Sequence, residues 1–176
     1  MKPRGLLMIE HRLIEKVLAL ANGKAAAMTE ESHDPVFVDT VVDFIRTYAD
    51  RTHHGKEEDI LFAALERKSL GEVDARVMNE LVEEHKQARS KVAQIVALNE
   101  RAKRGERGTA GEIKAIISWL ASFYPVHIIK EDKMFFPDTE RCFDGKELEE
   151  MLERFHAFDA QMIHEKYNKV FESLKA

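Results

Sequence analysis

Two short segments of the chain carry the same pattern of histidine, lysine and acidic residues. His53 begins the first, HHGKEEDILF, and His127 begins the second, HIIKEDKMFF. They share the pattern H-x-x-K-E-[ED]-x-[IM]-[LF]-F without a gap, and its first glutamates are Glu57 and Glu131. A histidine and a glutamate at positions i and i+4 share one face of a helix, and imidazole with carboxylate suits iron, manganese or zinc. The repeated pattern therefore predicts metal chemistry.

A second pair of histidines follows the same repeat. The Glu-His pair at positions 10–11 recurs at positions 84–85. The interval between these two pairs equals the interval between His53 and His127, and we call it the repeat interval. Because the repeat is strongest in polar residues rather than in apolar ones, it indicates function more than packing. The sequence predicts two similar helical hairpins, each with a histidine followed by a His-x-x-x-Glu motif.

The repeated side chains are expected to point into the core. They continue the apolar helix faces at spacings of three and four, as the first histidine does between Leu7 and Ile14. Ionisable groups in an apolar core are costly, and two metal ions would remove that cost. Any one of these histidines alone is more often a hydrogen-bonded core or surface residue, but the shared interval favours a metal site. The predicted ligands are His11, His53, Glu57, His85, His127 and Glu131.

Helices are the elements that must position these side chains. Apolar residues recur with helical periodicity along most of the chain, and no segment alternates convincingly like a strand. Asp34 and Pro35 predict a helix start, Thr109 and Glu112 have the spacing of a capping box, and Pro137 is expected to end a helix. The expected helices cover about residues 6–28, 35–67, 73–103, 109–137 and 146–174.

Long helices joined by short loops predict an all-α fold, an antiparallel up-down four-helix bundle with an additional C-terminal helix. We expect residues 1–176 to form one domain, with the bundle over about 5–137 and a helical extension over about 138–176. Pro125 should kink the fourth helix of the bundle, because it removes one ladder hydrogen bond.

Composition excludes several other classes. With 176 residues, 44% of them hydrophobic, the chain is expected to be globular. The net charge of −5, with both signs interspersed, disfavours a nucleic-acid partner, and no segment is apolar enough for a membrane span or a signal peptide. A cytoplasmic location is the default expectation. The single Cys142 excludes an intramolecular disulfide and a cysteine-based zinc site.

Taken together, the motifs resemble the hemerythrin-type His-His-Glu cation-binding domains over about residues 5–137. The resemblance implies a four-helix bundle that holds a non-haem di-iron centre of two iron ions, with manganese or zinc as possible substitutes. All the histidines predicted above, and Glu57, match ligand positions of that family. For the last carboxylate, oxygen-carrying hemerythrins imply Asp132, whereas related bacterial and iron-sensing domains imply Glu131. The internal repeat pairs Glu131 with Glu57 and favours Glu131.

One departure from the oxygen carriers bears on function. They have His-x-x-x-His on the third helix, whereas Leu81 stands at the first of these positions here. One metal then loses a histidine, the two metals become nearly equivalent, and more positions stay open for water, O2, peroxide or NO. This favours a di-iron protein that binds O2, NO, peroxide or iron for sensing, storage or stress response. The alternative is a di-iron redox enzyme that reduces peroxide or NO or repairs iron–sulfur clusters.

Three further residues are left as open candidates. His54 lies one position off the inward phase and is either a further ligand or a group that supports one. Tyr124, one turn before His127, is either a hydrogen-bonding group at the site or a core residue. His164 could approach one end of the site, although a surface role suits it better. The expected partner is a small diatomic ligand or peroxide.

Overall fold

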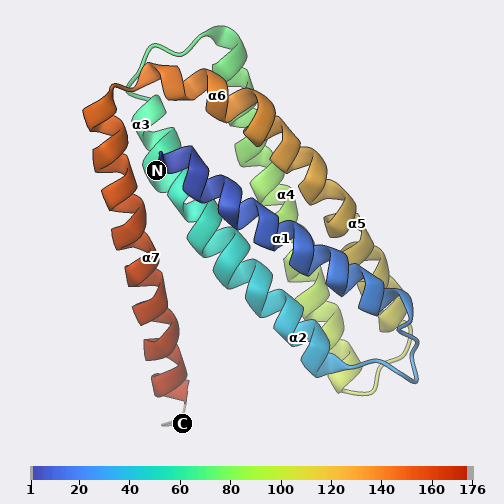
Figure 1. Cartoon of the computed structure of the whole chain (residues 1–176). Helices are drawn as coiled ribbons and strands as arrows, with labels where there is room; N and C mark the ends of the chain where they lie inside the picture. The colour runs from blue at the N-terminus through green and yellow to red at the C-terminus, as the bar shows by residue number, and fades with distance from the viewer. Residues whose placement is uncertain (1, 174–176) are drawn as a thin grey trace.

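The computed structural model describes the backbone of residues 2–173 and the side chains of residues 2–164 and 166. Four helical columns run alternately up and down, and a fifth helix lies beside them (Figure 1). The predicted all-α bundle with an additional C-terminal helix is confirmed. The first column is α1 (Pro3–Ala26), and the third is α4 (Glu72–Lys103). The second column consists of α2 (Pro35–Phe44), η1 (Ile45–His54), η2 (Glu57–Phe62) and α3 (Ala63–Leu65), and the fourth consists of α5 (Thr109–Lys130), η3 (Glu131–Phe135) and α6 (Phe136–Thr139). A short 3-10 turn, η4 (Glu140–Cys142), then leads to the fifth helix, α7 (Gly145–Ser173).

The second column begins as its sequence predicts. The carboxylate of Asp34 accepts hydrogen bonds from the backbone N–H groups of Val36 and Phe37, both at 3.1 Å. The fourth column, in contrast, continues past Pro137 to Thr139, so it ends slightly later than predicted. Pro137 is the second residue of α6 and directly follows the π turns of η3.

The expected capping box at the start of α5 does not form. The residue before the helix is Gly108, with a φ of +89°, a left-handed conformation that favours glycine. Thr109 is therefore the first helical residue, and its side chain caps nothing. The carboxylate of Glu30, from the loop after α1, accepts a hydrogen bond from the Ala110 N–H at 2.9 Å instead. A distant acidic residue thus replaces the local cap.

The second and fourth columns widen into π-helical turns where the repeated motif lies. His53 lies at the end of η1, Glu57 begins η2 and Glu131 begins η3. A π turn bonds residue i to residue i+5, so it holds more residues than an α turn, and such turns are frequent at functional sites. Two consecutive side chains can then face the bundle centre, which an α-helical reading of the sequence does not predict.

Two apolar clusters enclose the middle of the bundle. One contains buried residues towards the α2 end, among them Ile14, Leu18, Ala88 and Ile117. The other lies towards the α6 end and includes Leu7, Ile60, Leu81, Phe135 and, from α7, Phe155. The repeated polar residues lie between the two clusters, so bulk water is kept from them on both sides.

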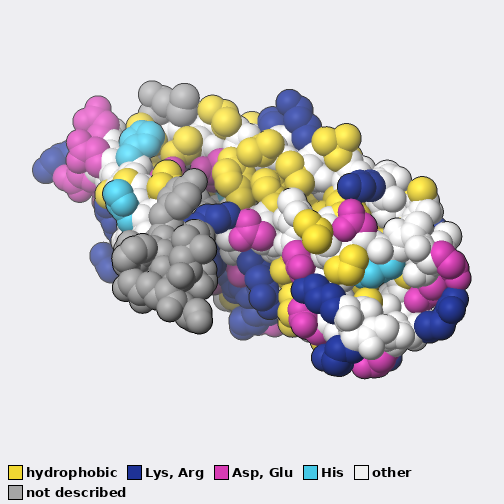
Figure 2. Space-filling view, turned by 90° about the horizontal axis from the view of Figure 1, so that it is seen from below, with side chains coloured by type: hydrophobic (Ala, Val, Ile, Leu, Met, Phe, Trp, Pro, Cys, Tyr) yellow, Lys and Arg dark blue, Asp and Glu magenta, His cyan; other side chains and the backbone are white. Residues whose placement is uncertain are grey.

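The surface and α7 complete the fold. α7 packs against α1 and the second column, where the ring of Phe158 lies over Gly55 so closely that a Cβ there would be 2.7 Å from it. On the face shown in Figure 2, Lys and Arg side chains alternate with Asp and Glu, and hydrophobic side chains gather between them. Among the described residues, no helix is long and apolar enough to cross a membrane.

Candidate metal centre

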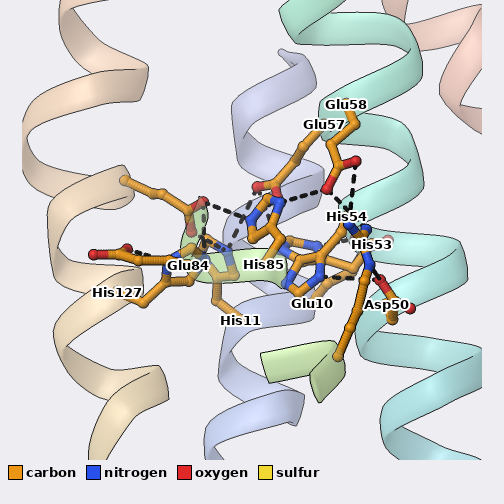
Figure 3. A network of polar contacts seen from close by, with 12 residues as sticks. Glu10, His11, Asp50, His53, His54, Glu57, Glu58, Glu84, His85 and His127 are labelled. Atoms are coloured by element: carbon orange, nitrogen blue, oxygen red, sulfur yellow. Dashed lines mark hydrogen bonds and ion pairs between the residues drawn. The ribbon is translucent and has the colours of Figure 1, made fainter. Parts of the chain in front are cut away.

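Five histidines and two glutamates from all four columns converge at the centre of the bundle, and Figure 3 shows most of them at close range. Each of the seven is at most 2% exposed. Their possible ligand atoms form two groups, and within each group these atoms lie within 4.8 Å of one another. The first group is His11, His53, Glu57 and Glu131, and the second is His54, His85 and His127. All six predicted ligands are therefore brought together, and His54 joins them.

The two glutamates lie between the groups. Glu57 directs Oε1 at Nε2 of His53, at 3.4 Å, and Oε2 at Nε2 of His85, at 3.5 Å. Glu131 directs Oε2 at Nε2 of His11 and Oε1 at Nε2 of His127, both at 3.2 Å. Each carboxylate therefore offers one oxygen to each group, which is the arrangement that a bridging ligand of two metal ions needs.

The unpaired atoms at this centre fit a metal. Within the described part of the chain, neither oxygen of Glu57 or Glu131 has a hydrogen-bond partner, and the same holds for Nε2 of His11, His85 and His127. Buried polar atoms without partners each cost about 1–3 kcal/mol, so a concentration of them in one place needs an explanation. Lone pairs of imidazole and carboxylate that share one centre are the donor set of iron, manganese and zinc sites. The residues present fit such ions.

A carboxylate fixes the ring of four of the five histidines. In these pairs Nδ1–H donates to the carboxylate, which leaves Nε2 turned to the centre. The distances are 2.8 Å for His11 to Asp132, 2.8 Å for His53 to Glu10, 2.7 Å for His85 to Glu58 and 2.7 Å for His127 to Glu84. The pairs follow the internal repeat: two link residues within a hairpin, and two link the hairpins.

These orienting carboxylates are themselves paired with cations. The lysines of the shared motif, Lys56 and Lys130, bond to Glu10 and Glu84. Burial alone would raise the pKa of Glu10 and of Glu84, but the neighbouring histidine and lysine outweigh burial and lower both. The carboxylates therefore stay ionised as hydrogen-bond acceptors. The sequence did not lead us to predict these roles. The pattern that could have indicated them is that each of these residues directly precedes a predicted ligand and recurs at the repeat interval.

Asp132 has an orienting place and does not share the centre with Glu131. Its carboxylate contacts the outer nitrogen of His11, and Arg12 bonds to its other oxygen at 2.5 Å. Glu131, fully buried, faces three histidines. Glu131 thus faces the centre and Asp132 faces the outer side of His11, and the choice of Glu131 as the last ligand stays a prediction.

In the metal-free protein, the pKa values of the histidines at the centre are shifted in opposite directions. Burial acts to lower the pKa of His11 and of His127, but Asp132 and Glu131 outweigh it at His11, and Glu131 and Glu84 at His127. The pKa of His11 rises to about 9 and that of His127 to about 10. Burial and the neighbouring His11 lower the pKa of His53 to about 4.

The pKa values of the two central carboxylates, Glu57 and Glu131, are also shifted in opposite directions. Burial and the charge of Glu131 raise the pKa of Glu57, whereas His127, His11 and His85 overcome burial and lower the pKa of Glu131. Near neutral pH the metal-free protein therefore holds protons on His11, His127 and Glu57, and bound cations would replace them.

His54 lies inside the cluster rather than off its inward face. Its ring stacks on that of His85, with centroids 3.8 Å apart, and no described residue forms a hydrogen bond with either of its nitrogens. The π turns of the second column explain this, since consecutive residues 53 and 54 both turn inward. With His54 the second group has three imidazoles and the first has two. The two groups of donor atoms thus differ in composition, contrary to the expectation of two nearly equivalent positions, and His54 offers an imidazole where Leu81 offers none.

The remaining candidates lie elsewhere or beside the cluster. His164 is exposed on α7 and lies in neither group of ligand atoms. Tyr124 is buried, its ring centroid is 6.2 Å from that of His127, and its hydroxyl has no hydrogen-bond partner among the described residues. It is thus next to the site, as expected, but not hydrogen-bonded to it.

Comparison with known proteins gives one family. The model of the hemerythrin HHE cation binding domain matches residues 3–139 and, a second time, residues 78–175. The second match begins close to one repeat interval after the first, as two similar hairpins would lead us to expect. No curated protein and no solved structure matches the chain.

Proposed function

Because the chain belongs to the hemerythrin HHE cation-binding family, we propose that its two ligand groups hold two iron ions bridged by Glu57 and Glu131. The observation that carries the proposal is the position of these glutamates, each with one oxygen towards each group. Manganese or zinc would suit the same donors.

The protein binds O2, NO, peroxide or iron itself, for sensing, storage or stress response. Bound iron would supply a redox-active, electrophilic centre for such small ligands. The chain's own residues orient the imidazoles through four carboxylates and keep bulk water away with the two apolar clusters. We place the protein in the cytoplasm, with a small diatomic ligand or peroxide rather than nucleic acid or a membrane as its partner.

Reconstitution with ferrous iron tests this proposal. We expect about two iron ions per chain by elemental analysis, and an absorption spectrum that changes on addition of O2, peroxide or NO. A stable adduct supports binding or sensing, whereas sustained consumption of peroxide or NO identifies the alternative, a di-iron redox enzyme. Protein that keeps no more than one iron after loading and desalting would contradict the two-ion centre.

A further inference from the structure

A row of aromatic rings along α5 connects the second ligand group to the surface of the bundle. Phe123 stacks on His127, with ring centroids 5.7 Å apart and an interplanar angle of 14°. Trp119 stacks on Phe123 in turn, at 4.6 Å and 19°. His127 belongs to the second ligand group, whereas Phe123 and Trp119 are only partly buried. These three rings therefore form one continuous stack from the candidate metal centre outwards, and we call it the α5 stack.

The packing of the bundle does not require these rings. One repeat interval separates Ile45 from Trp119, and the same interval separates Ala49 from Phe123. Ile45 is 2% exposed and Ala49 is fully buried. The first hairpin thus has an aliphatic and a small side chain where the second has two aromatic ones, although both hairpins keep the histidine one turn later. The α5 stack is therefore a feature of one hairpin and indicates a role beyond packing.

Other aromatic contacts of the ligand rings end inside the core. Phe62 stacks on His85 at 6.2 Å, and Phe136 stacks on His11 at 5.9 Å. Both phenylalanines are at most 3% exposed. Of the ring contacts that the structure describes, the α5 stack alone joins a ligand to a partly exposed ring.

Trp119 is the member of the stack that can give up an electron, because indole is oxidised far more easily than a phenyl ring. It is the one tryptophan of the chain. Tyr124 also lies beside the centre, but a phenol that loses an electron must also lose its proton. Its hydroxyl is buried, and no described residue accepts a hydrogen bond from it. Trp119, in contrast, is partly exposed, so solvent can take its proton.

The surroundings of Trp119 indicate the charge of an electron donor. The amine of Lys91 lies over the indole ring, 5.6 Å from its centroid. A cation at this place attracts anionic molecules to the outer end of the stack. A small anionic one-electron donor, of the ascorbate type, suits this position.

We propose that the α5 stack is an electron route, along which Trp119 passes electrons from such a donor to the metal centre after peroxide has oxidised it. The inference rests on the proposed function, because it needs the iron centre. Electron transfer weakens steeply with the distance between rings, so a continuous stack is the favoured path.

The electrons and protons of this route balance. In each transfer the indole of Trp119 loses one electron, its proton goes to solvent, and one ferric ion becomes ferrous. The donor then returns one electron to Trp119, and solvent returns the proton. Two such transfers supply the two electrons that turn one peroxide into two water molecules, with two protons taken from solvent.

Oxidation of Trp119 by peroxide, with no donor present, tests the inference. Iron-loaded and zinc-loaded proteins receive equal peroxide, and peptide mass spectrometry together with tryptophan fluorescence measures the loss of Trp119. Zinc has no redox chemistry and serves as the silent ion. We expect much faster oxidation of Trp119 with iron than with zinc, a tryptophan radical in the electron paramagnetic resonance spectrum of freeze-quenched samples, and protection of Trp119 by ascorbate.

Variants distinguish the route from an oxidant that diffuses through solution. Phe123→Leu interrupts the stack and should lose most of the iron-dependent oxidation of Trp119. Phe44→Leu removes a ring that stacks on Tyr48, at 5.3 Å, outside the α5 stack, and should keep that oxidation. Met134, 53% exposed, reports oxidants in solution by forming its sulfoxide, which should appear equally in all three proteins. Phe123→Met replaces Phe123→Leu if the latter does not fold, and the iron content of every protein is measured first.

The results separate this inference from the proposed function. A wild type with no more than one iron per chain contradicts the proposed function and removes the electron route with it. Two irons per chain, with Trp119 oxidised no faster than in the zinc-loaded protein or equally fast in the wild type and the Phe123 variant, would overturn the electron route and leave the two-ion centre standing.

Discussion

The two hairpins of the bundle carry one polar pattern in two different surroundings. The lysine of the shared motif is fully buried in the first hairpin, as Lys56, and its side chain is 22% exposed in the second, as Lys130. The residue before it is Gly55 in the first hairpin and Ile129, 58% exposed, in the second. The difference arises because the described part of α7 covers Gly55 and Lys56 of the first hairpin, where Phe158 lies over Gly55 and Asp159 pairs with Lys56 (Figure 1).

This difference indicates that the same motif can contribute differently to the stability of the fold in the two hairpins. Lys56 joins Glu10 to Asp159 of α7, which lies 2.5 Å from its amine, and Glu10 in turn fixes the ring of His53. The docking of α7 is therefore connected to one candidate ligand through three polar contacts. Among the residues that the structure describes, Lys130 pairs with the partly exposed Glu80 and Glu84.

The largest effect is expected where the two hairpins meet. Glu131→Gln keeps the volume of the side chain but removes the charge that faces three histidines, so we expect metal content to fall below one ion per chain. The neighbouring Asp132→Asn alters the partner of His11 and Arg12 but no predicted ligand, and we expect about a 10–100-fold loss of affinity with both sites still filled in excess metal. Elemental analysis after desalting, with a competing chelator for affinities, measures both. Equal losses in the two variants would show that Asp132 is a ligand.

The buried lysine gives the next largest effect. Lys56→Met leaves Glu10 without its buried cation, and we expect the free energy of unfolding to fall by about 3–5 kcal/mol. Lys130→Met, at the equivalent position, removes a partly exposed pair and should cost less than about 1 kcal/mol. Urea unfolding of the metal-free proteins measures both values, and similar costs at the two positions would refute the role assigned to α7.

In the metal-free protein, the equivalent histidines His53 and His127 should affect the pH dependence of stability in opposite ways, because their pKa values are shifted in opposite directions. The pKa of His127 is raised from 6.5 to about 10, so the stability it contributes is present below pH 6.5 and is lost as pH rises towards 10. The pKa of His53 is lowered from 6.5 to about 4, so stability is lost as pH falls from 6.5 towards 4.

Variants of the two histidines, freed of metal with a chelator, separate the loss of stability at alkaline pH from the loss at acid pH. His127→Gln should flatten the alkaline loss of stability, and His53→Gln should flatten the acid loss, as measured by urea unfolding from pH 4 to 10. If both substitutions changed the same limb, the electrostatic difference between the hairpins would be wrong.

The smallest effect concerns the contact of α7 with Gly55. Alanine favours a helix over glycine by about 1 kcal/mol, but its Cβ would lie 2.7 Å from the Phe158 ring. Gly55→Ala should therefore stabilise the Phe158→Ala protein by about 1 kcal/mol and stabilise the wild type less or not at all. Thermal or urea unfolding of the four proteins in this cycle gives the coupling. Additive effects would mean that Phe158 does not press on Gly55 in solution.

The sequence was enough to predict the bundle, because helical periodicity and the internal repeat agree at every predicted ligand position. It left the role of His54 open, because α-helical spacing puts this residue one position off the inward face, whereas the π turns of the second column bring it into the cluster. The cap of α5 was missed for a different reason, since Glu30 reaches Ala110 from a loop far away in sequence. The roles of Glu10 and Glu84 could have been predicted from the sequence, because each directly precedes a predicted ligand histidine and the pair recurs at the repeat interval.

Anomalous diffraction from crystals of the iron-loaded protein tests the central claim most directly. The account predicts two iron peaks per chain, one next to His11 and His53 and one next to His54, His85 and His127, with Glu57 and Glu131 in contact with both. A single peak, or two peaks of which neither touches both glutamates, would contradict it.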